Sequence, residues 1–548
     1  MNLIILLGIS GTVLLTAYYT YANFVLTRLK ISNKNITPAN TMEDGVDYVP
    51  SKTPVVLGHH FASIAGAGPI IGPIIAVTFG WIPAVIWILI GGIFFGAVHD
   101  TTSLVASMRH GGKSIGTIIQ TYIGQNGKRL FMIFAFSTLI LIIAVFVDII
   151  SKVFVNDPGV ASASILFIGL AIGFGLIHKA TGNKKGAFII ISFIGVILMY
   201  YFVHLGTQIP LALDYKLWVA LLMAYAFLAS VTPVTFLLQP RDYLCSFLLY
   251  GLILFAVAGV VIANPEIKMD NQVQFSTENL GYLFPVLFIT VACGAISGFH
   301  SVVASGTTSK QINKEQDVKV VGFGGMLIES FLAIISVGAV IVLSRGEYNS
   351  KLITQDPVTM FADGLGGIIS VLGVSPALAI TFVALAVSAF ALTTLDTCTR
   401  LARFIFQEFF EDVDNSTGKV FAGNRYIATG IVVVLSILLL TSGEFTTLWP
   451  IFGSANQLLA ALALLAVAIW LIKKKINATF VLIPMFFMFA VTLSSLLLFA
   501  VQNFNRGVYV LSGIAGILFV LSVVLIWLAR QSLKKELAQK LDQKAEKV

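Results

Sequence analysis

Apolar runs of about twenty residues recur along almost the whole of this chain. A run of that length can cross a bilayer as a helix, and fifteen such runs can be counted in the 548 residues. Only 11% of the residues are charged, whereas soluble domains carry about a quarter. A soluble enzyme, a disordered chain and a nucleic-acid-binding domain are therefore excluded. We predict an all-α integral membrane protein with spans near residues 3–27, 55–79, 82–106, 129–151, 160–178, 186–206, 217–238, 242–263, 282–304, 318–343, 368–395, 425–442, 447–472, 479–500 and 508–529.

The positions of Lys and Arg predict the orientation of these spans. With the N-terminus outside, the eight segments that would face the cytoplasm hold 28 of the 34 Lys and Arg residues. This asymmetry is the one that the positive-inside rule requires. The run at 3–27 has no positive residue before it and no small-residue cleavage site after it, which favours a retained span over a signal peptide. We expect a multi-pass protein of the inner (cytoplasmic) membrane with its C-terminus in the cytoplasm.

Two of the spans are interrupted by glycine, proline and hydroxyl residues. Gly66, Gly68 and Pro69 lie near the middle of span 2, and Ser230 and Thr232 precede Pro233 in span 7. Irregular backbone at membrane depth is tolerated only where it is buried in protein or lines a cavity. Two interrupted spans that lie five helices apart indicate a secondary transporter with inverted repeats and a site near the midplane. Two independently kinked helices remain the alternative.

This pattern predicts the organisation of the chain and the position of its substrate site. The second halves of the two spans would begin near Ile70 and Val234, with N-terminal N–H groups suited to a substrate carboxylate. Predicted substrate-binding residues are His59, His60, Gly66, Gly68, Pro69, Ser230 and Thr232. The expected segments are an N-terminal span and loop (1–54), a first repeat of helices 2–6 (55–210), a second repeat of helices 7–11 (211–400), accessory helices (401–530) and a charged tail (531–548).

Three segments resemble the carbon starvation protein A family. They are GHHFASIAGAGPIIGPIIAVTFGWIPAVIWILIGGIFFGAVHD (58–100), PRDYL (240–244) and SGFHSVVASGTTSKQ (297–311), and the resemblance extends from about residue 55 to about residue 460. It implies an inner-membrane transporter that is induced when carbon is scarce and takes up peptides, with relatives that carry pyruvate. It also implies the five-plus-five inverted repeat of leucine transporters.

Four acidic residues lie within or at the ends of predicted spans. Glu329 is near the middle of span 10, where an unpaired carboxylate favours its protonated form, and is the first candidate for proton coupling. Asp100, after His99 in span 3, is the second candidate. A structural carboxylate paired with a neighbouring helix is the alternative for Glu329. Asp148 and Asp396 lie near span ends, where solvation at the interface explains them.

Histidine, hydroxyl and arginine residues supply further candidates. His300, Ser305, Thr307 and Thr308 lie late in span 9, the helix that helps to form a sodium site in leucine transporters; a small-residue packing face is the alternative. Arg241 and Asp242 form either a gate pair or a positive-inside anchor. His59 and His60 point to different faces of one helix, so they are not expected to chelate one metal.

The function predicted from these features is secondary active import of peptides as part of the carbon starvation response, and no enzyme activity. A proton- or sodium-coupled symporter for pyruvate or another small carboxylate is the alternative, followed by a channel and by a nutrient sensor without transport. We expect no cofactor beyond the coupling ion, H⁺ or Na⁺. A Walker motif is lacking, which argues against a primary pump, and the three cysteines are far apart in sequence, which argues against a disulfide framework and a metal site. The expected partners are the substrate and the lipid bilayer, not nucleic acid, and the oligomeric state is open.

Overall fold

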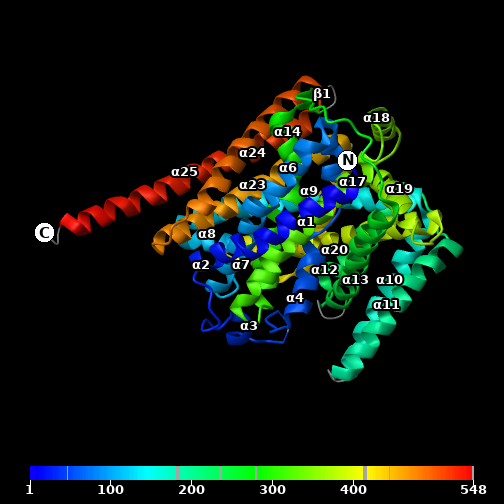
Figure 1. Ribbon diagram of the computed structural model, residues 1–548. Coiled ribbons are helices and arrows are strands. Elements are labelled where there is room, and N and C mark those ends of the chain that lie inside the picture. Colours follow the sequence, from blue (N-terminus) through cyan, green and yellow to red (C-terminus); the bar gives the residue numbers. More distant parts are fainter. Residues whose placement is uncertain are drawn as a thin grey trace.

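Helices form almost the whole structure, because a backbone inside a bilayer must satisfy its hydrogen bonds within its own segment. The computed structural model describes residues 1–45, 47–180, 185–233, 237–277, 280–411, 416–442 and 445–545 (Figure 1). The elements are α1 (Leu3–Tyr19), α2 (Tyr21–Arg28), α3 (Pro38–Thr41), α4 (Thr53–Ile64), α5 (Gly68–Ala76), α6 (Trp81–Gly91), α7 (Ala97–Arg109), α8 (Ile115–Ile123), α9 (Gln125–Asn156), α10 (Pro158–Ala180), α11 (Lys185–Gln208), α12 (Tyr215–Val231), α13 (Leu238–Ala263), β1 (Ser276–Thr277), β2 (Gly281–Tyr282), α14 (Leu283–Thr290), α15 (Ala292–Ala295), α16 (Gly298–Gly306), α17 (Gly325–Ile341), α18 (Arg345–Thr354), α19 (Pro357–Ser370), α20 (Pro376–Glu411), α21 (Ser416–Gly423), α22 (Arg425–Ser442), α23 (Phe445–Lys473), α24 (Thr479–Asn505) and α25 (Tyr509–Ala545).

The predicted spans coincide with helices throughout the described residues. Eleven helical segments are long and apolar enough to cross a membrane, and α4 with α5 forms one further, bent span. The remaining three predicted runs correspond to the shorter apolar helices α12 and α22 and to the divided segment α14–α16. The multi-pass helical prediction is confirmed, whereas the count of fifteen spans stays a prediction.

The loops gather at two ends of the bundle. At one end, Arg109 Nε donates a 2.5 Å hydrogen bond to Glu315 Oε1, and Lys128 Nζ lies 3.7 Å from Glu408 Oε1. These contacts join three loops that were assigned to the cytoplasm. Tyr48, from a fourth such loop, donates to the carbonyl of Gly111 at the same end.

The loops assigned to the outside lie together at the other end. Arg345 Nη2 donates a 2.7 Å hydrogen bond to Asp270 Oδ1, and this guanidinium lowers the pKa of Asp270. Asn156 Nδ2 donates to Asp356 Oδ2 at 2.9 Å. The loops therefore alternate between the two ends as predicted. Which end faces the cytoplasm stays a prediction.

Labelling of single cysteines tests this orientation. Cysteine in place of Lys268 should react with an impermeant maleimide added outside cells, whereas cysteine in place of Lys314 should react only after permeabilisation. The three native cysteines are all buried, so their background labelling should be low. Labelling of the Lys314 position from outside would contradict the predicted orientation.

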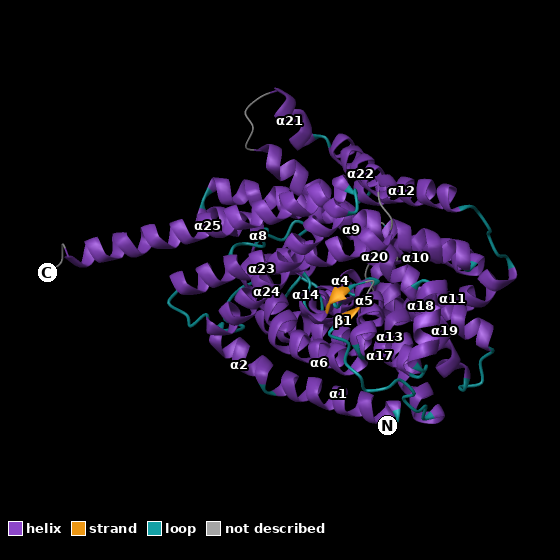
Figure 2. Cartoon of the chain, turned by 90° about the horizontal axis from the view of Figure 1, so that it is seen from above, coloured by secondary structure: helices purple, strands orange, loops and turns teal. Residues whose placement is uncertain are grey.

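The span formed by α4 and α5 is bent by 48° at its break, as the glycines and prolines of span 2 predicted. Pro69 occupies the first turn of α5, where a missing N–H costs nothing. Figure 2 shows α4 and α5 inside the bundle, with α11 near its edge and α25 extending away from it. The charged tail continues as part of α25 to Ala545.

The second interrupted span is not the one that was predicted. Helix α12 runs without a break to Val231, and Pro233 follows its end, where its missing N–H interrupts no helix. The predicted start of a second half near Val234 falls outside the described residues. The chain is interrupted instead between α14 and α16, where Ile296 and Ser297 have extended backbone.

The two interrupted spans touch each other through glycine. A Cβ atom on Gly68 would lie 2.4 Å from Cys293 Sγ and 2.7 Å from Cys293 Cβ, and one on Gly72 would lie 2.2 Å from the carbonyl oxygen of Thr290. Only hydrogen fits at such distances, so these glycines permit the close packing of α5 against α14 and α15.

We expect Gly68→Ala to destabilise the protein by about 1–3 kcal/mol, the usual cost of overpacking. Cys293→Gly removes both clashing atoms, so the double variant Gly68→Ala/Cys293→Gly should recover part of the lost thermal stability. Gly173→Ala in α10 is the matched control, because a Cβ there meets nothing within 4 Å. Melting temperatures in detergent measure the effect. Equal melting temperatures for the single and double variants would contradict this contact.

Candidate functional site

The break in the second interrupted span is held by an amide side chain from α23. Asn456 Nδ2 donates a 2.9 Å hydrogen bond to Ser297 Oγ, and Asn456 Oδ1 accepts from the backbone N–H of Phe299 at 2.9 Å. A small cavity of about 10 Å³ lies beside this break and is lined by Gly66, Cys293 and Asn456, among others. That volume suits about one water molecule. Gly66, which was predicted to bind substrate, therefore lines the same cavity as Cys293 and Asn456, which were not predicted.

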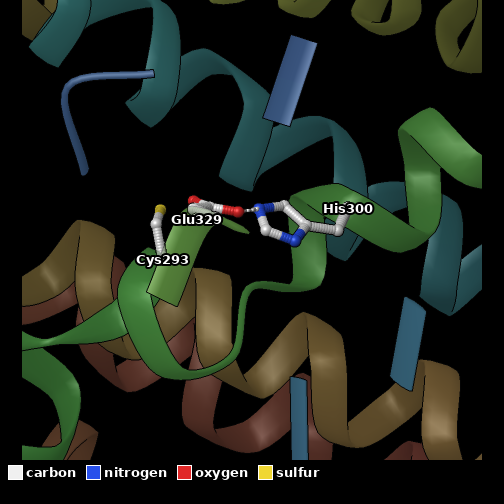
Figure 3. Close-up of side chains that lie close together, drawn as sticks. All are labelled: Cys293, His300 and Glu329. Atoms are coloured by element: carbon white, nitrogen blue, oxygen red, sulfur yellow. Dashed lines mark ion pairs between the residues drawn. The ribbon is translucent and has the colours of Figure 1, made fainter. Parts of the chain in front are cut away.

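A buried chain of acidic and histidine side chains lies close to the two breaks. Asp100 on α7 accepts on two sides: Oδ1 lies 2.8 Å from His99 Nδ1, and Oδ2 lies 2.9 Å from His300 Nδ1. The other ring nitrogen of His300, Nε2, lies 3.5 Å from Glu329 Oε2. Figure 3 shows the Glu329 carboxyl group between the His300 ring and Cys293. Asp100, His300 and Glu329, three of the predicted ion-coupling residues, are therefore brought together.

The Glu329 carboxyl group lacks ordinary hydrogen-bond partners. Its side chain is fully buried, and neither carboxylate oxygen has a hydrogen bond within the described part of the chain. His300 Nε2 is likewise without one. A charged carboxylate in such surroundings needs a cation or a proton. Because Asp100 fixes His300 through Nδ1, the Nε2 atom is the one left to exchange a proton with Glu329.

The same place could hold a metal ion. Ligand atoms of Cys293, His300 and Glu329 all lie within 4.8 Å of one another, and a thiolate, an imidazole and a carboxylate are a ligand set that suits zinc-like ions. Cys293 Sγ is also within 3.8 Å of Ser297 Oγ and of Asn456 Nδ2. The expectation of no metal, which rested on cysteine spacing, stays a prediction.

A second buried network surrounds the predicted gate residues. Arg241 Nη2 lies 3.3 Å from Asp242 Oδ1, and Arg241 Nη1 donates to Asp396 Oδ2 and to the Tyr225 hydroxyl. Asp242 Oδ2 lies 3.1 Å from His59 Nδ1. The network therefore connects the first half of the broken span, α4, with α12, α13 and α20.

This network corrects two interpretations. Arg241 is only 1% exposed, so a simple interfacial anchor does not describe it. Asp396 is fully buried and paired with Arg241, so solvation at the interface does not explain it either. Asp148 is 5% exposed and accepts hydrogen bonds of 2.7 Å from Lys152 and Tyr215. The three residues lie near the ends of predicted spans, and this position suggested contact with water. Their actual partners come from other helices or from the next turn of the same helix, which the sequence pattern does not show.

The predicted sodium-site hydroxyl groups bond to separate partners. Ser305 Oγ donates to the carbonyl of Ser301 and Thr307 Oγ1 to that of Val303, both within their own helix. Thr308 Oγ1 lies 2.9 Å from His60 Nδ1. His60 thus joins α4 to the segment after α16, whereas His59 joins it to Asp242. The two adjacent histidines point to different partners, as predicted.

Ser230 and Thr232 do not line the cavity beside Gly66 and Cys293. Ser230 Oγ lies 3.2 Å from Thr429 Oγ1, and Thr232 Oγ1 donates to the carbonyl of Leu228. The prediction placed them at a mid-span break, whereas α12 ends there. Thr232 lines a separate open cavity instead, and a substrate-binding role for both residues stays a prediction.

Sequence reasoning missed Cys293, Asn456 and Tyr225 as members of these clusters. A signal existed for Asn456, because adjacent amide residues Asn456 and Gln457 stand in the middle of an apolar run, and polar residues within spans are costly unless bonded. Gln457 Nε2 donates a 2.7 Å hydrogen bond to the carbonyl of Phe288. Cys293 and Tyr225 carried no such signal, since both residue types are common in apolar helices.

Comparisons with known proteins agree on a family of transporters. The family model described as carbon starvation protein CstA matches residues 2–353 and 347–495. A peptide transporter CstA of Bacillus subtilis is 33% identical over 524 residues, which cover 86% of each chain. A pyruvate/proton symporter BtsT of Escherichia coli is 31% identical and covers 85% of this chain and 77% of its own. The fold is similar to that of a manganese transporter of Eremococcus coleocola, with a TM-score of 0.52, 12% identity and coverage of 89% and 99% of the two chains.

Proposed function

Because the chain belongs to the carbon starvation protein CstA family, we propose that it imports peptides across the cytoplasmic membrane, driven by protons. Relatives of the family carry the names of transporters rather than enzymes, and the many apolar helices mark a multi-pass membrane protein. The names of relatives such as the Bacillus subtilis protein support peptides as cargo. The family name supports a role in the carbon starvation response.

The observation that carries proton coupling is the buried Glu329 carboxyl group, which has no hydrogen bond within the described residues and faces His300. It lies 3.5 Å from His300 Nε2, fully buried, on a helix that packs against the first interrupted span. A carboxyl and an imidazole can pass one proton between them once they approach by a few tenths of an ångström or are bridged by one water molecule. Each protonation state changes the charge of a fully buried group, so each favours a different packing of the surrounding helices. Protonation thereby becomes linked to conformation.

Protons are favoured over sodium by the arrangement of the hydroxyl groups. A sodium site needs several oxygen atoms converging on one point. Ser305 and Thr307 direct their hydroxyl groups to carbonyls of their own helix instead. The proton-coupled name of one relative, the pyruvate/proton symporter of Escherichia coli, is consistent with this choice.

We assign the transport core to two inverted groups of five spans with bounds that differ from the sequence-based ones. The first consists of α4/α5, α6/α7, α9, α12 and α13, with α10 and α11 as an inserted pair; the second consists of α14–α16, α17, α20, α22 and α23. Corresponding contacts support this assignment. Helix α13 packs on α4 as α23 packs on α16, and the short helix α8 packs on α9 as α19 packs on α20.

The substrate site then lies where α5 begins. Its first residue, Gly68, is buried beside the break, and the positive dipole end of a helix favours a carboxylate. Pro69 has no N–H group and those of Ile70 and Ile71 donate to the carbonyl of Ala67, so the dipole and the N–H group of Gly68 are what this end offers. The network of His59, Asp242, Arg241 and Asp396 supplies the gate. It holds α4 against three other helices, and opening the site toward that end requires α4 to leave Asp242.

Uptake into proteoliposomes tests the proposed function. Labelled dipeptide should accumulate when the outside is made acidic in sodium-free buffer, and a sodium gradient alone should drive nothing. Accumulation with sodium alone would contradict proton coupling. Labelled pyruvate provides the second arm, because a relative is named for it; uptake of pyruvate without dipeptide would replace the proposed cargo. Absence of uptake of both, with intact protein, would contradict import.

We expect amidation of the substrate carboxylate to abolish competition for uptake. A dipeptide amide should inhibit uptake of the labelled dipeptide at least about tenfold less well than the free acid, because the N-terminus of α5 loses its anion. Inhibition constants measured in the same proteoliposomes decide this, with an N-acetylated dipeptide, which keeps its carboxylate, as the control. Equal inhibition by amide and acid would place the carboxylate elsewhere.

A further inference from the structure

An open cavity of about 620 Å³ lies away from the proposed transport site, where α12 ends, α20 approaches its last turns and α22 begins. Its lining includes Arg400, Arg403, Arg425 and Asp47, together with Phe404 and Tyr426. Asp47 belongs to the loop that contains Tyr48, so the cavity lies at the end of the bundle assigned to the cytoplasm. Within this described lining, three cations face a single acidic residue.

The carbonyl groups at the end of α12 accept hydrogen bonds from only some of the N–H donors of the buried side chains Arg400 and Arg403. Arg400 Nη2 donates to the carbonyls of Ala229 at 2.7 Å and Thr232 at 2.5 Å, and Arg403 Nη1 donates to that of Ser230 at 2.8 Å. Each arginine is 5% exposed. The Nε atoms of both have no hydrogen-bond partner in the described structure. Each guanidinium thus retains donors that the helix end does not use.

Charge makes an anion the expected ligand of this cavity. Two neighbouring guanidinium groups repel each other, and burial strengthens that repulsion. Helix α22 begins at Arg425, so its positive dipole end adds to the same field. Planar guanidinium groups bind phosphate oxygens in pairs. A phosphate group in the cavity would satisfy the free Nε donors and neutralise the excess charge.

The surroundings favour a phospholipid over a free phosphate ion. Helices α12 and α22 pack side by side through Ser230 and Thr429. Two residues before each member of this contact, Leu228 on α12 is 61% exposed and Ile427 on α22 is 38% exposed. Acyl chains could cover these apolar side chains while the headgroup enters the cavity. Basic pockets between membrane helices at the cytoplasmic side are suited to anionic headgroups.

We propose that this cavity binds the phosphate of an anionic phospholipid headgroup through Arg400 and Arg403. The lipid would link the ends of α12, α20 and α22. The site is independent of the substrate site and of the proposed cargo, so failure of either proposal leaves the other standing.

Lipid binding by the full-length protein in detergent tests the site. The probes are dioleoyl phosphatidylglycerol, dioleoyl phosphatidylcholine and inorganic phosphate, with bound lipid counted by native mass spectrometry and affinity measured by titration. We expect phosphatidylglycerol to bind at least about tenfold more tightly than phosphatidylcholine, and Arg403→Gln to remove most of that preference. Arg403→Lys, which keeps the charge but loses the paired donors, should fall between the two.

Two further variants separate the site from general effects. Gly423→Trp should block the cavity, because Gly423 lines it and a Cβ there meets nothing within 4 Å; it leaves both arginines in place and guards against misfolding of the Arg403 variants. Arg129→Gln, an exposed arginine at the same end that does not line the cavity, should have no effect. Unchanged preference for phosphatidylglycerol in both Arg403→Gln and Gly423→Trp would overturn the site. Arg403-dependent binding of inorganic phosphate as tight as that of the lipid would overturn the choice of a lipid.

Discussion

Glu329→Gln is expected to abolish accumulation of substrate driven by a pH gradient while leaving exchange of substrate across the membrane intact. Glutamine has the same shape as protonated glutamate but cannot release a proton. The variant should therefore behave as if Glu329 were permanently neutral, and Nε2 of His300, 3.5 Å away, loses its proton partner. We expect the accumulated level to fall at least about 100-fold, on the scale of the loss of a proton-transferring group.

Two measurements in the same proteoliposomes separate coupling from damage. Exchange of labelled for unlabelled substrate without a gradient reports whether the site still binds and reorients. Glu411→Gln, which changes an exposed glutamate at the end of α20, is the matched control and should keep both activities. Normal gradient-driven accumulation in Glu329→Gln would remove this residue from the mechanism. Loss of exchange as well as accumulation would assign Glu329 a structural or substrate-binding role.

Asp396→Asn is expected to lower the free energy of unfolding by about 3 kcal/mol, the lower end of the cost of leaving a buried charge without its partner. Asp396 is the carboxylate on α20 that accepts from Arg241 Nη1, and both side chains are buried. Asp242, at 3.3 Å, would remain as a partial partner, which is why we expect the lower end of the range. Melting temperature in detergent measures the loss.

The matched control is Asp363→Asn, which removes one partner of the more exposed Lys351–Asp363 pair at 3.6 Å. Exposed pairs contribute about 1 kcal/mol or less, so its melting temperature should hardly change. The double variant Arg241→Gln/Asp396→Asn should be more stable than Asp396→Asn alone, because no unpaired charge then remains. A single variant as stable as the control would show that Asp396 does not hold Arg241, and the gate would lose its central ion pair.

Individual acidic residues show how far sequence reasoning reached. The position of Glu329 in the middle of an apolar run identified it as a candidate for proton coupling. The structure places its carboxyl group beside His300. The same criterion failed for Asp396, because its position near the end of a predicted span suggested water as its partner. Its partner, Arg241, lies 155 residues away, and no local pattern links them.

The interrupted spans show the same limit. In span 2, five of eight consecutive residues are glycine or proline, which disfavour a continuous helix. The backbone preferences of these residues were therefore sufficient to predict the break. In the segment that follows Leu283, Gly294 and Gly298 flank the break, and Asn456 from α23 holds it through the Ser297 hydroxyl group and the backbone N–H of Phe299. Proline in span 7 suggested a break, but α12 simply ended before it, since a proline after a helix end costs nothing.

The sequence by itself determined that this chain lies in a membrane, which runs are helical, which loops share an end and where the first span breaks. These properties follow from local quantities: the length of an apolar run, the side on which Lys and Arg accumulate, and the dihedral angles that glycine and proline allow. Only the tertiary structure decided which buried charges are partners, where the second break lies and that a cationic cavity exists beside α12. These depend on which helices pack together, because the energy of a buried charge is set by atoms within a few ångströms and not by its neighbours along the chain.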